Sequence, residues 1–204
     1  MMYNFFALLA NAVFKSRGKF IIEGKENLPD EKGYVIACTH RSWVDVVALG
    51  AGVFPEQIHF MAKKELFEKS LAGKFLTSIN AFPVNRENPG TSTLKIPLQL
   101  LRKGKTVGIF PSGTRSSEEA SLKRGAVTIA SMAKTVIVPA AFYGPESVKA
   151  LLSGKPILLK IGQPIDLSSG KKDKDELSKI TMQLSETMLA LEEELKSNKI
   201  SSRK

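Results

Sequence analysis

The chain has 204 residues, of which 43% are hydrophobic and 25% charged, a composition typical of one globular domain and unlike that of a disordered or polytopic membrane protein. Its single cysteine, Cys38, excludes an internal disulfide framework and fits a reducing compartment. The formal net charge of +10 favours an anionic partner, but sparse aromatic residues and scattered basic residues argue against nucleic acid.

Residues 2–14 are almost wholly apolar and are followed by Lys15, Arg17 and Lys19. This run is too short to cross a bilayer, which takes about 20 apolar residues, and the charge follows it rather than preceding it as in a secretory signal. We therefore expect residues 1–17 to form an amphipathic helix in the interface of an anionic membrane. The alternative is a first helix that only packs on the core. The membrane interpretation predicts a peripheral, monotopic protein on the cytoplasmic face of the cell membrane.

Further along the chain, strand-like apolar runs alternate with helical stretches. This alternation predicts that residues 18–204 form a single α/β domain with a mixed central sheet flanked by helices. We expect strands over 20–23, 34–39, 58–61, 81–85, 106–111, 136–142 and 157–161, and helices over 43–53, 64–78, 91–103, 124–134 and 173–197. The last helix has the clearest pattern, an apolar stripe expected to pack on the sheet or a neighbouring helix. The stripe consists of Leu177, Ile180, Leu184, Met188, Leu191 and Leu195.

The strand that ends at Thr39 is followed by His40 and, five residues later, by Asp45. Five residues along a continuous helix would place two side chains about 140° apart. They can meet only if His40 precedes the helix and Asp45 lies in its first turn. Ser42 supports that geometry, because Ser-x-x-Asp resembles a capping box with Ser42 as the N-cap. Asp45 then serves either the helix start alone or also the orientation of His40 as a general base.

Two strand ends carry groups suited to an anion. Arg86 follows the strand over 81–85, where its guanidinium is either solvated or directed at a phosphate. The strand over 106–111 runs into a tight polar turn, which is either a plain turn or an anion site built from N–H groups, hydroxyls and a guanidinium. This turn comprises Ser112, Gly113, Thr114 and Arg115.

Lys123 and Arg124 lie at the N-terminus of the helix expected next. Two cations oppose the dipole at a helix N-terminus unless an anion is bound there, so this position also favours a phosphate. Ser112 is not in a Gly-x-Ser-x-Gly elbow and is not expected to be a nucleophile. The sequence has no metal-ligand cluster, Walker loop or Rossmann fingerprint, and we expect no metal and no cofactor.

In chain order, four stretches resemble the motif blocks of the glycerolipid acyltransferase family. His40 and Asp45 match its catalytic His-x4-Asp motif, and Arg86 matches the arginine that ends the second block. Residues 110–116 match the third block and residues 137–140 the short apolar fourth. Two flanking stretches agree as well, and the likeness covers about residues 20–165. The flanking stretches are Gly24-x-Glu26-Asn27-Leu28-Pro29 and Lys63-Lys64-Glu65-Leu66.

Two positions depart from the family pattern. Thr39 stands where the family usually has Asn before the histidine, and Ser112 stands where the third block usually has Glu. The missing carboxylate at Ser112 leaves open how the glycerol moiety is held and which head group is accepted. His40, Asp45 and Arg115 are retained, so the resemblance still implies the family's transfer chemistry.

The resemblance implies an enzyme of phospholipid biosynthesis that esterifies the sn-2 hydroxyl of lysophosphatidic acid and yields phosphatidic acid. His40 would take the hydroxyl proton, and Asp45 would orient His40. Arg115, with Arg86 and Lys123 as weaker candidates, would hold the acceptor phosphate, while N–H groups near Gly113 would stabilise the oxyanion. Thr114 and Ser112 belong to the same binding loop. The donor would be acyl-CoA or acyl-carrier protein.

Three alternatives remain open at the level of sequence. The acceptor is another lysophospholipid, as Ser112 suggests, or the His–Asp pair belongs to a thioester hydrolase that needs no acceptor. The third alternative is a non-catalytic module that binds anionic lipid or nucleic acid, which would explain the charge but has no need of His-x4-Asp.

Overall fold

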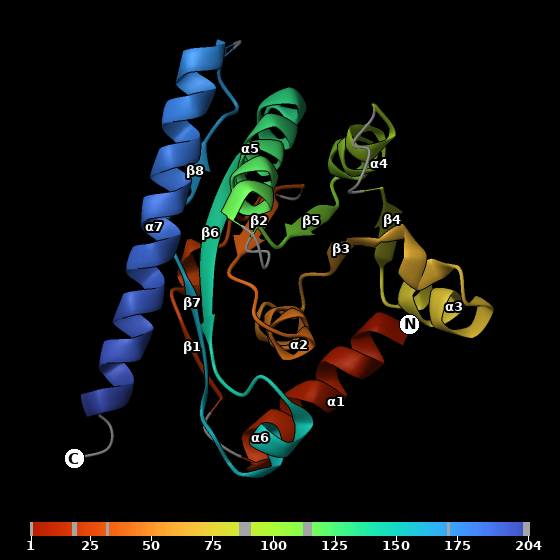
Figure 1. Cartoon of the computed structure of the whole chain (residues 1–204), viewed down its shortest axis with the longest axis vertical. Helices are drawn as coiled ribbons and strands as arrows, with labels where there is room; N and C mark the ends of the chain where they lie inside the picture. The colour runs from red at the N-terminus through yellow and green to blue at the C-terminus, as the bar shows by residue number, and fades with distance from the viewer. Residues whose placement is uncertain are drawn as a thin grey trace.

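The computed structural model describes residues 2–17, 20–31, 33–85, 91–111, 116–170 and 172–201. An eight-stranded sheet runs in the order β1-β7-β6-β2-β5-β3-β4, with β8 paired to β6 (Figure 1). Each expected strand is present. The strands are β1 (Phe20–Glu23), β2 (Val35–Cys38), β3 (Ile58–Lys63), β4 (Ala81–Val84), β5 (Thr106–Ile109), β6 (Val136–Tyr143), β7 (Ile157–Ile161) and β8 (Ile165–Asp166).

The sheet is mixed, as predicted. Strands β4, β3, β5, β2 and β6 are parallel neighbours, whereas β7 and β8 run antiparallel to β6, and β1 runs parallel to β7. The carboxyl ends of parallel strands open on one edge of a sheet, where α/β proteins bind ligands. The segments that follow β2, β3, β4 and β5 therefore start from the same edge.

Helices cover both faces of the sheet. The core beneath α1 and α2 includes Ile36, Leu49 and Phe142, and the core on the other face, beneath α4, α5 and α7, includes Val107 and Met188. The α-helices are α1 (Met2–Arg17), α2 (Trp43–Gly52), α3 (Ser70–Ser78), α4 (Thr91–Arg102), α5 (Ser116–Ala133), α6 (Val148–Leu152) and α7 (Lys174–Ser201), and the 3₁₀ turns are η1 (Lys25–Asn27) and η2 (Lys64–Phe67).

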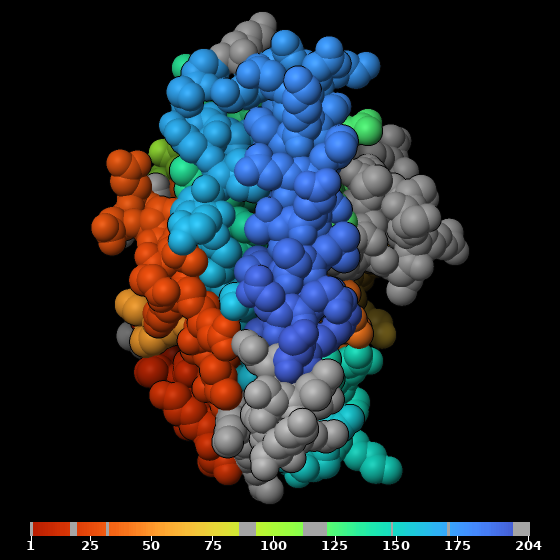
Figure 2. Space-filling model, turned by 90° about the vertical axis from the view of Figure 1, so that its left-hand side faces the viewer, coloured from red at the N-terminus to blue at the C-terminus, as the bar shows by residue number. Residues whose placement is uncertain are grey.

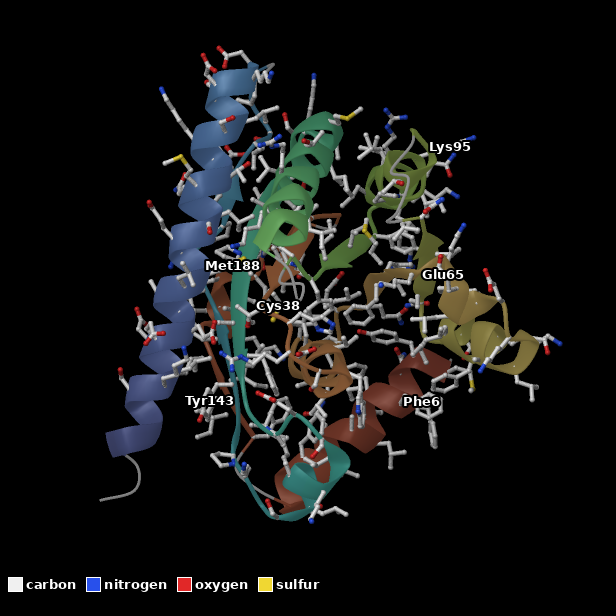
Figure 3. The ribbon with its side chains drawn as sticks, viewed as in Figure 1. Phe6, Cys38, Glu65, Lys95, Tyr143 and Met188 are labelled. Atoms are coloured by element: carbon white, nitrogen blue, oxygen red, sulfur yellow. The ribbon has the colours of Figure 1, made fainter. Side chains whose placement is uncertain are left out.

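The apolar stripe predicted for the last helix is confirmed in α7. Leu184, Met188 and Leu195 are buried against β6, β7 and α5. Burying a side chain of this size stabilises the fold by about 1.5–3 kcal/mol. Figure 2 shows α7 along the length of one face of the molecule, and Met188 points from it toward the sheet and α5 (Figure 3).

Helix boundaries differ from the prediction in two places. Helix α5 begins at Ser116, eight residues before the expected start, because residues 116–123 have no apolar stripe that would mark a helix in the sequence. The stretch expected as one helix over 64–78 is divided into η2 and α3, because Lys69 adopts an extended backbone between them. Helix α6 and strand β8 were not predicted, since five and two residues are too few to show a period.

Helix α1 packs on the core with one face and exposes an apolar second face. Tyr3, Ala7 and Phe14 are buried, whereas Phe5 and Leu8 are among its exposed apolar side chains. The Tyr3 hydroxyl lies 3.5 Å from the Gly50 carbonyl of α2 and accepts a 3.2 Å hydrogen bond from the Ile58 N–H of β3. Helix α1 therefore packs on the core, and its exposed apolar face is the face that the membrane interpretation requires. None of the described helices is long and apolar enough to cross a membrane.

Candidate active site

The predicted pair of His40 and Asp45 is present at the carboxyl end of β2. His40 lies between β2 and α2, and its Nδ1 is 2.8 Å from Asp45 Oδ1. A carboxylate can only accept a hydrogen bond, so Nδ1 is the donor and Nε2 is left to accept a proton from a substrate. Asp45 is fully buried, whereas the His40 side chain is 34% exposed. A buried carboxylate that orients a partly exposed imidazole is the arrangement of a general base.

Asp45 also completes the capping box of α2. Its second oxygen, Oδ2, accepts hydrogen bonds from the Arg41 N–H at 2.7 Å and from the Ser42 N–H at 2.8 Å. Ser42 is the N-cap, and its hydroxyl accepts from the Val44 N–H at 3.2 Å. The two functions that the sequence left as alternatives are therefore combined in one side chain. Two backbone donors fix the carboxylate that in turn fixes His40.

Phe110 links the first motif to the third. Its ring lies 5.0 Å from the His40 ring and stacks at 6.0 Å on Phe60 of β3. Gly108 of β5 permits this arrangement, because a Cβ atom there would lie 2.6 Å from Ile58 and 2.9 Å from Phe60. The chain thus enters the third block beside His40. Because β2 and β5 are parallel neighbours, the segments that follow the two strands start side by side.

Most of the predicted substrate-binding residues lie outside the described residues. These are Arg86, Ser112, Gly113, Thr114 and Arg115. The described strand ends show where their segments begin. Strand β5 is the immediate neighbour of β2, whereas β4 lies three strands away, about 14 Å at the usual strand spacing. The polar turn after β5 thus starts closer to His40 than the segment that carries Arg86.

Lys123 does not lie at a helix N-terminus, and that prediction is wrong. Helix α5 begins at Ser116, so Lys123 and Arg124 lie about two turns inside it. The effect of the helix dipole falls off within the first turn, so it does not favour an anion at these residues. The Lys123 side chain is buried, and its Nζ donates a 2.9 Å hydrogen bond to Ser185 Oγ on α7. Binding of the acceptor phosphate by Lys123 stays a prediction, now without the support of helix geometry.

An ionic cluster next to His40 was missed in the sequence. Arg41 pairs with Glu192 of α7 and lies 3.6 Å from Glu146. Glu192 is nearly buried and also lies 3.4 Å from Lys196. Although partial burial disfavours the charged guanidinium, the hydrogen bond and charge of Glu192 raise the pKa of Arg41. Helix α7 thereby holds Arg41, the residue that follows His40.

The other motif residues support the backbone around the site. Thr39, the departure from the family Asn, accepts a 2.9 Å hydrogen bond from the Phe142 N–H of β6. The fourth block, residues 137–140, lies in β6 and pairs with β2. Gly24 has φ of +74° and lies against the Ile161 carbonyl, where a Cβ atom would clash, and Asn27 Nδ2 donates to that carbonyl at 2.9 Å. Trp43, the first residue of α2, is exposed.

The site therefore presents a partly exposed imidazole held by a buried carboxylate. Within the described parts of the chain, no group of three or more His, Cys, Asp or Glu side chains could hold a metal ion. The chemistry that the described side chains offer is proton transfer at His40 Nε2.

Comparison with protein families places the chain in a known class. The acyltransferase family matches residues 19–143, a span that includes the His40–Asp45 pair, β2 to β6 and the third block. The chain therefore belongs to the acyltransferase family.

Individual relatives share most of the chain. It is 50% identical over 196 residues to the 1-acyl-sn-glycerol-3-phosphate acyltransferase of Bacillus subtilis (strain 168), covering 95% of this chain and 98% of that protein. It is 36% identical over 179 residues to the enzyme of the same name from Streptococcus pneumoniae (strain ATCC BAA-255 / R6), covering 86% and 67%. The crystal structure of the 1-acyl-sn-glycerophosphate (LPA) acyltransferase PlsC from Thermotoga maritima has the same fold. Its TM-score is 0.71 at 23% identity, over 95% of this chain and 79% of that one.

Proposed function

We propose that this protein is a 1-acyl-sn-glycerol-3-phosphate acyltransferase, which transfers an acyl chain from a thioester to the sn-2 hydroxyl of lysophosphatidic acid and yields phosphatidic acid. The single observation that carries the proposal is the His40–Asp45 hydrogen bond at 2.8 Å, at the carboxyl edge of the sheet. The names of the relatives, one of them 50% identical over almost its whole length, support the acceptor and the reaction.

In this reaction, His40 Nε2 takes the proton of the acceptor hydroxyl as its oxygen attacks the thioester carbonyl carbon. The C–S bond then breaks, and the proton passes from His40 to the leaving thiolate. Asp45 keeps the imidazole in the tautomer that can accept the proton and stabilises the cation formed. Arg115, with Arg86 and Lys123, holds the acceptor phosphate by charge-assisted hydrogen bonds.

The acyl donor is acyl-CoA or acyl-carrier protein, and the acceptor comes from a membrane with anionic lipid. We propose that the exposed apolar face of α1 binds that membrane, which places the protein peripherally on the cytoplasmic face of the cell membrane. Deleting residues 1–17 would also remove Tyr3, Ala7 and Phe14 from the core. Replacing the exposed Phe5 and Leu8 by glutamine is therefore the cleaner test, and it should move the protein from liposomes to the supernatant.

The proposed activity is tested by thiol release from acyl-CoA and from acyl-carrier protein, with and without lysophosphatidic acid in mixed micelles. Release should depend on the acceptor and fall by about 10²- to 10⁴-fold in His40→Ala, the range for positioned base catalysis. His59→Ala is the control, because it alters the other histidine, which lies in β3. Release without acceptor would identify a hydrolase, and vesicle binding by a protein without transfer would favour a non-catalytic lipid-binding module.

Ser112 makes the head group a separate question. Competition among lysophospholipids that differ only in the head group should show a preference for lysophosphatidic acid. A higher kcat/KM with a larger head group would show instead that the protein acts on another lysolipid. Ser112→Glu, which restores the family residue, should then change that preference.

A further inference from the structure

A second group of exposed apolar side chains lies on the segment 64–78, which comprises η2 and α3. Leu66 and Phe75 are about half exposed, and Leu71 is 82% exposed. Within α3 only Gly73 is buried, and the partly buried Phe67 and Leu76 attach the segment to the core. Leu71 and Phe75 are four residues apart and share one helix face. An amphipathic helix that only covered a core would turn this face inward.

This group continues the exposed face of α1. The Phe75 ring packs edge-on against Phe6 of α1 at 5.3 Å, and Phe6 packs in turn against Phe5 at 5.4 Å. Figure 3 shows Phe6 on the part of α1 next to α3. We name the combined set the α1–α3 surface. It consists of Met2, Phe5, Leu8, Leu9, Val13, Leu66, Leu71 and Phe75, all of them exposed.

The charges around this surface favour an anionic bilayer as its partner. The segment 64–78 has three lysines against two glutamates, and residues 2–17 have two basic residues and no acidic one. Lys69 and Lys74 are exposed on either side of Leu71. Lysine is depleted in protein–protein interfaces, whereas lysines that flank apolar side chains are typical of interfacial helices on anionic lipid.

We propose that α3 and η2 insert into the same leaflet as α1, with Leu71 at the deepest point of the segment and Lys69 and Lys74 on the headgroups. This inference rests on the proposed membrane association of α1 and extends it to a second element. One interfacial helix leaves a protein free to rotate about the helix axis. Two elements in contact with the bilayer remove that rotation and hold the sheet in one orientation to the membrane.

The first test measures partition onto vesicles of phosphatidylcholine with phosphatidylglycerol. Leu71→Gln should lower the partition coefficient about tenfold, as expected for losing most of one leucine's burial. Leu189→Gln is the matched control, because Leu189 is also exposed, at 56%, and lies on α7. Lys69→Gln combined with Lys74→Gln should weaken binding to these vesicles but not to vesicles of phosphatidylcholine alone.

A second test locates Leu71 directly. Cys38 is the only cysteine, it is fully buried, and burial raises the pKa of its thiol, so it resists labelling. Leu71→Cys can then carry an environment-sensitive fluorophore, with Leu189→Cys as the control. The emission of the label at position 71 should shift to the blue when vesicles are added, and the label at position 189 should not respond.

The outcomes separate this inference from the proposed function. If the wild type binds vesicles and Leu71→Gln binds equally well, the contribution of α3 is refuted while the membrane proposal stands. If the wild type binds no vesicles, the membrane proposal itself fails. A blue shift that appears without vesicles and grows with protein concentration would show a second copy of the chain on this surface, and would also refute the inference. Transfer in micelles by His40 variants reports on the activity independently.

Discussion

Asp45 accepts hydrogen bonds from three donors, the imidazole of His40 and the N–H groups of Arg41 and Ser42. We expect Asp45→Asn to lower kcat by about 10²- to 10⁴-fold, because an amide cannot accept all three. It should also lower the free energy of unfolding by about 1–3 kcal/mol, since a buried donor is left without a partner. Denaturant unfolding and thiol release check both effects. His40→Gln is the contrast, with a similar loss of rate but little loss of stability.

Glu192 pairs with Arg41, whose N–H group in turn donates to Asp45. We expect Glu192→Ala to lower kcat about tenfold with little change in KM, because the loop that carries His40 loses its anchor on α7. The variant removes the hydrogen bond between Arg41 and Glu192, and hydrogen bonds to charged groups contribute about 1.5–3 kcal/mol. Glu193→Ala, an exposed neighbour on α7, is the control, and equal rates in both variants would exclude this role.

At the residue scale, helix geometry and the capping box showed where His40 and Asp45 must lie if they are to meet. They left the pairing itself open, and the resemblance to the family implied it. Glu192 could not be predicted. It lies 151 positions from Arg41 and carries the same kind of charge as its exposed neighbours on α7. Only the packing of α7 on the sheet distinguishes it from them.

At the scale of the elements, the packing of α1 on α2 and β3 involves the buried hydroxyl of Tyr3. Burial raises the pKa of Tyr3 from about 10 to about 12, so the folded state holds this proton more tightly than the unfolded chain. The stabilisation is complete below pH 10 and is lost as the pH rises toward 12, up to about 2–3 kcal/mol. Tyr3→Phe should flatten the fall in stability over this range, as measured by denaturant unfolding at several pH values. Tyr34, whose pKa burial also raises, should maintain part of the slope. An unchanged slope would show that Tyr3 ionises freely in the fold.

The elements themselves were largely predictable, and the exceptions have physical causes. Strands β1 to β7 and the long α7 can be predicted from the sequence, because each buries a run or stripe of apolar residues. The first turns of α5 do not, since residues 116–123 are polar and charged, and the prediction therefore began the helix at Arg124. That error produced the mistaken placement of Lys123 at a helix N-terminus.

For the whole molecule, the net charge of +10 and the α1–α3 surface predict two contributions to membrane binding. The electrostatic part should weaken with salt, because the screening length falls from about 10 Å at 0.1 M to about 3 Å at 1 M. Partition onto anionic vesicles should therefore decrease over this range without vanishing, since the apolar side chains still insert. Neutral vesicles should show little salt dependence. Binding to anionic vesicles that is insensitive to salt would mean that the basic residues contribute nothing.

The strand order could not be deduced from the sequence. The mixed sheet was expected, but the order β1-β7-β6-β2-β5-β3-β4 depends on which apolar runs pair, and all of them have similar patterns. The resemblance to the family implied that residues of the first three motif blocks serve one reaction. The sheet supplies the reason, because β2 and β5 are adjacent parallel strands and the fourth block in β6 pairs with the other side of β2.

The shared carboxylate has a consequence for how such a chain can change over many generations. Asp45 caps the start of α2 and also contacts His40. In a duplicated gene that is no longer selected for catalysis, a mutation that replaces the histidine therefore costs little stability. Replacing the aspartate would weaken the fold itself. We therefore expect inactive descendants of this fold to lose the histidine first and to keep the aspartate, so that an aspartate without its histidine indicates an enzymatic ancestry.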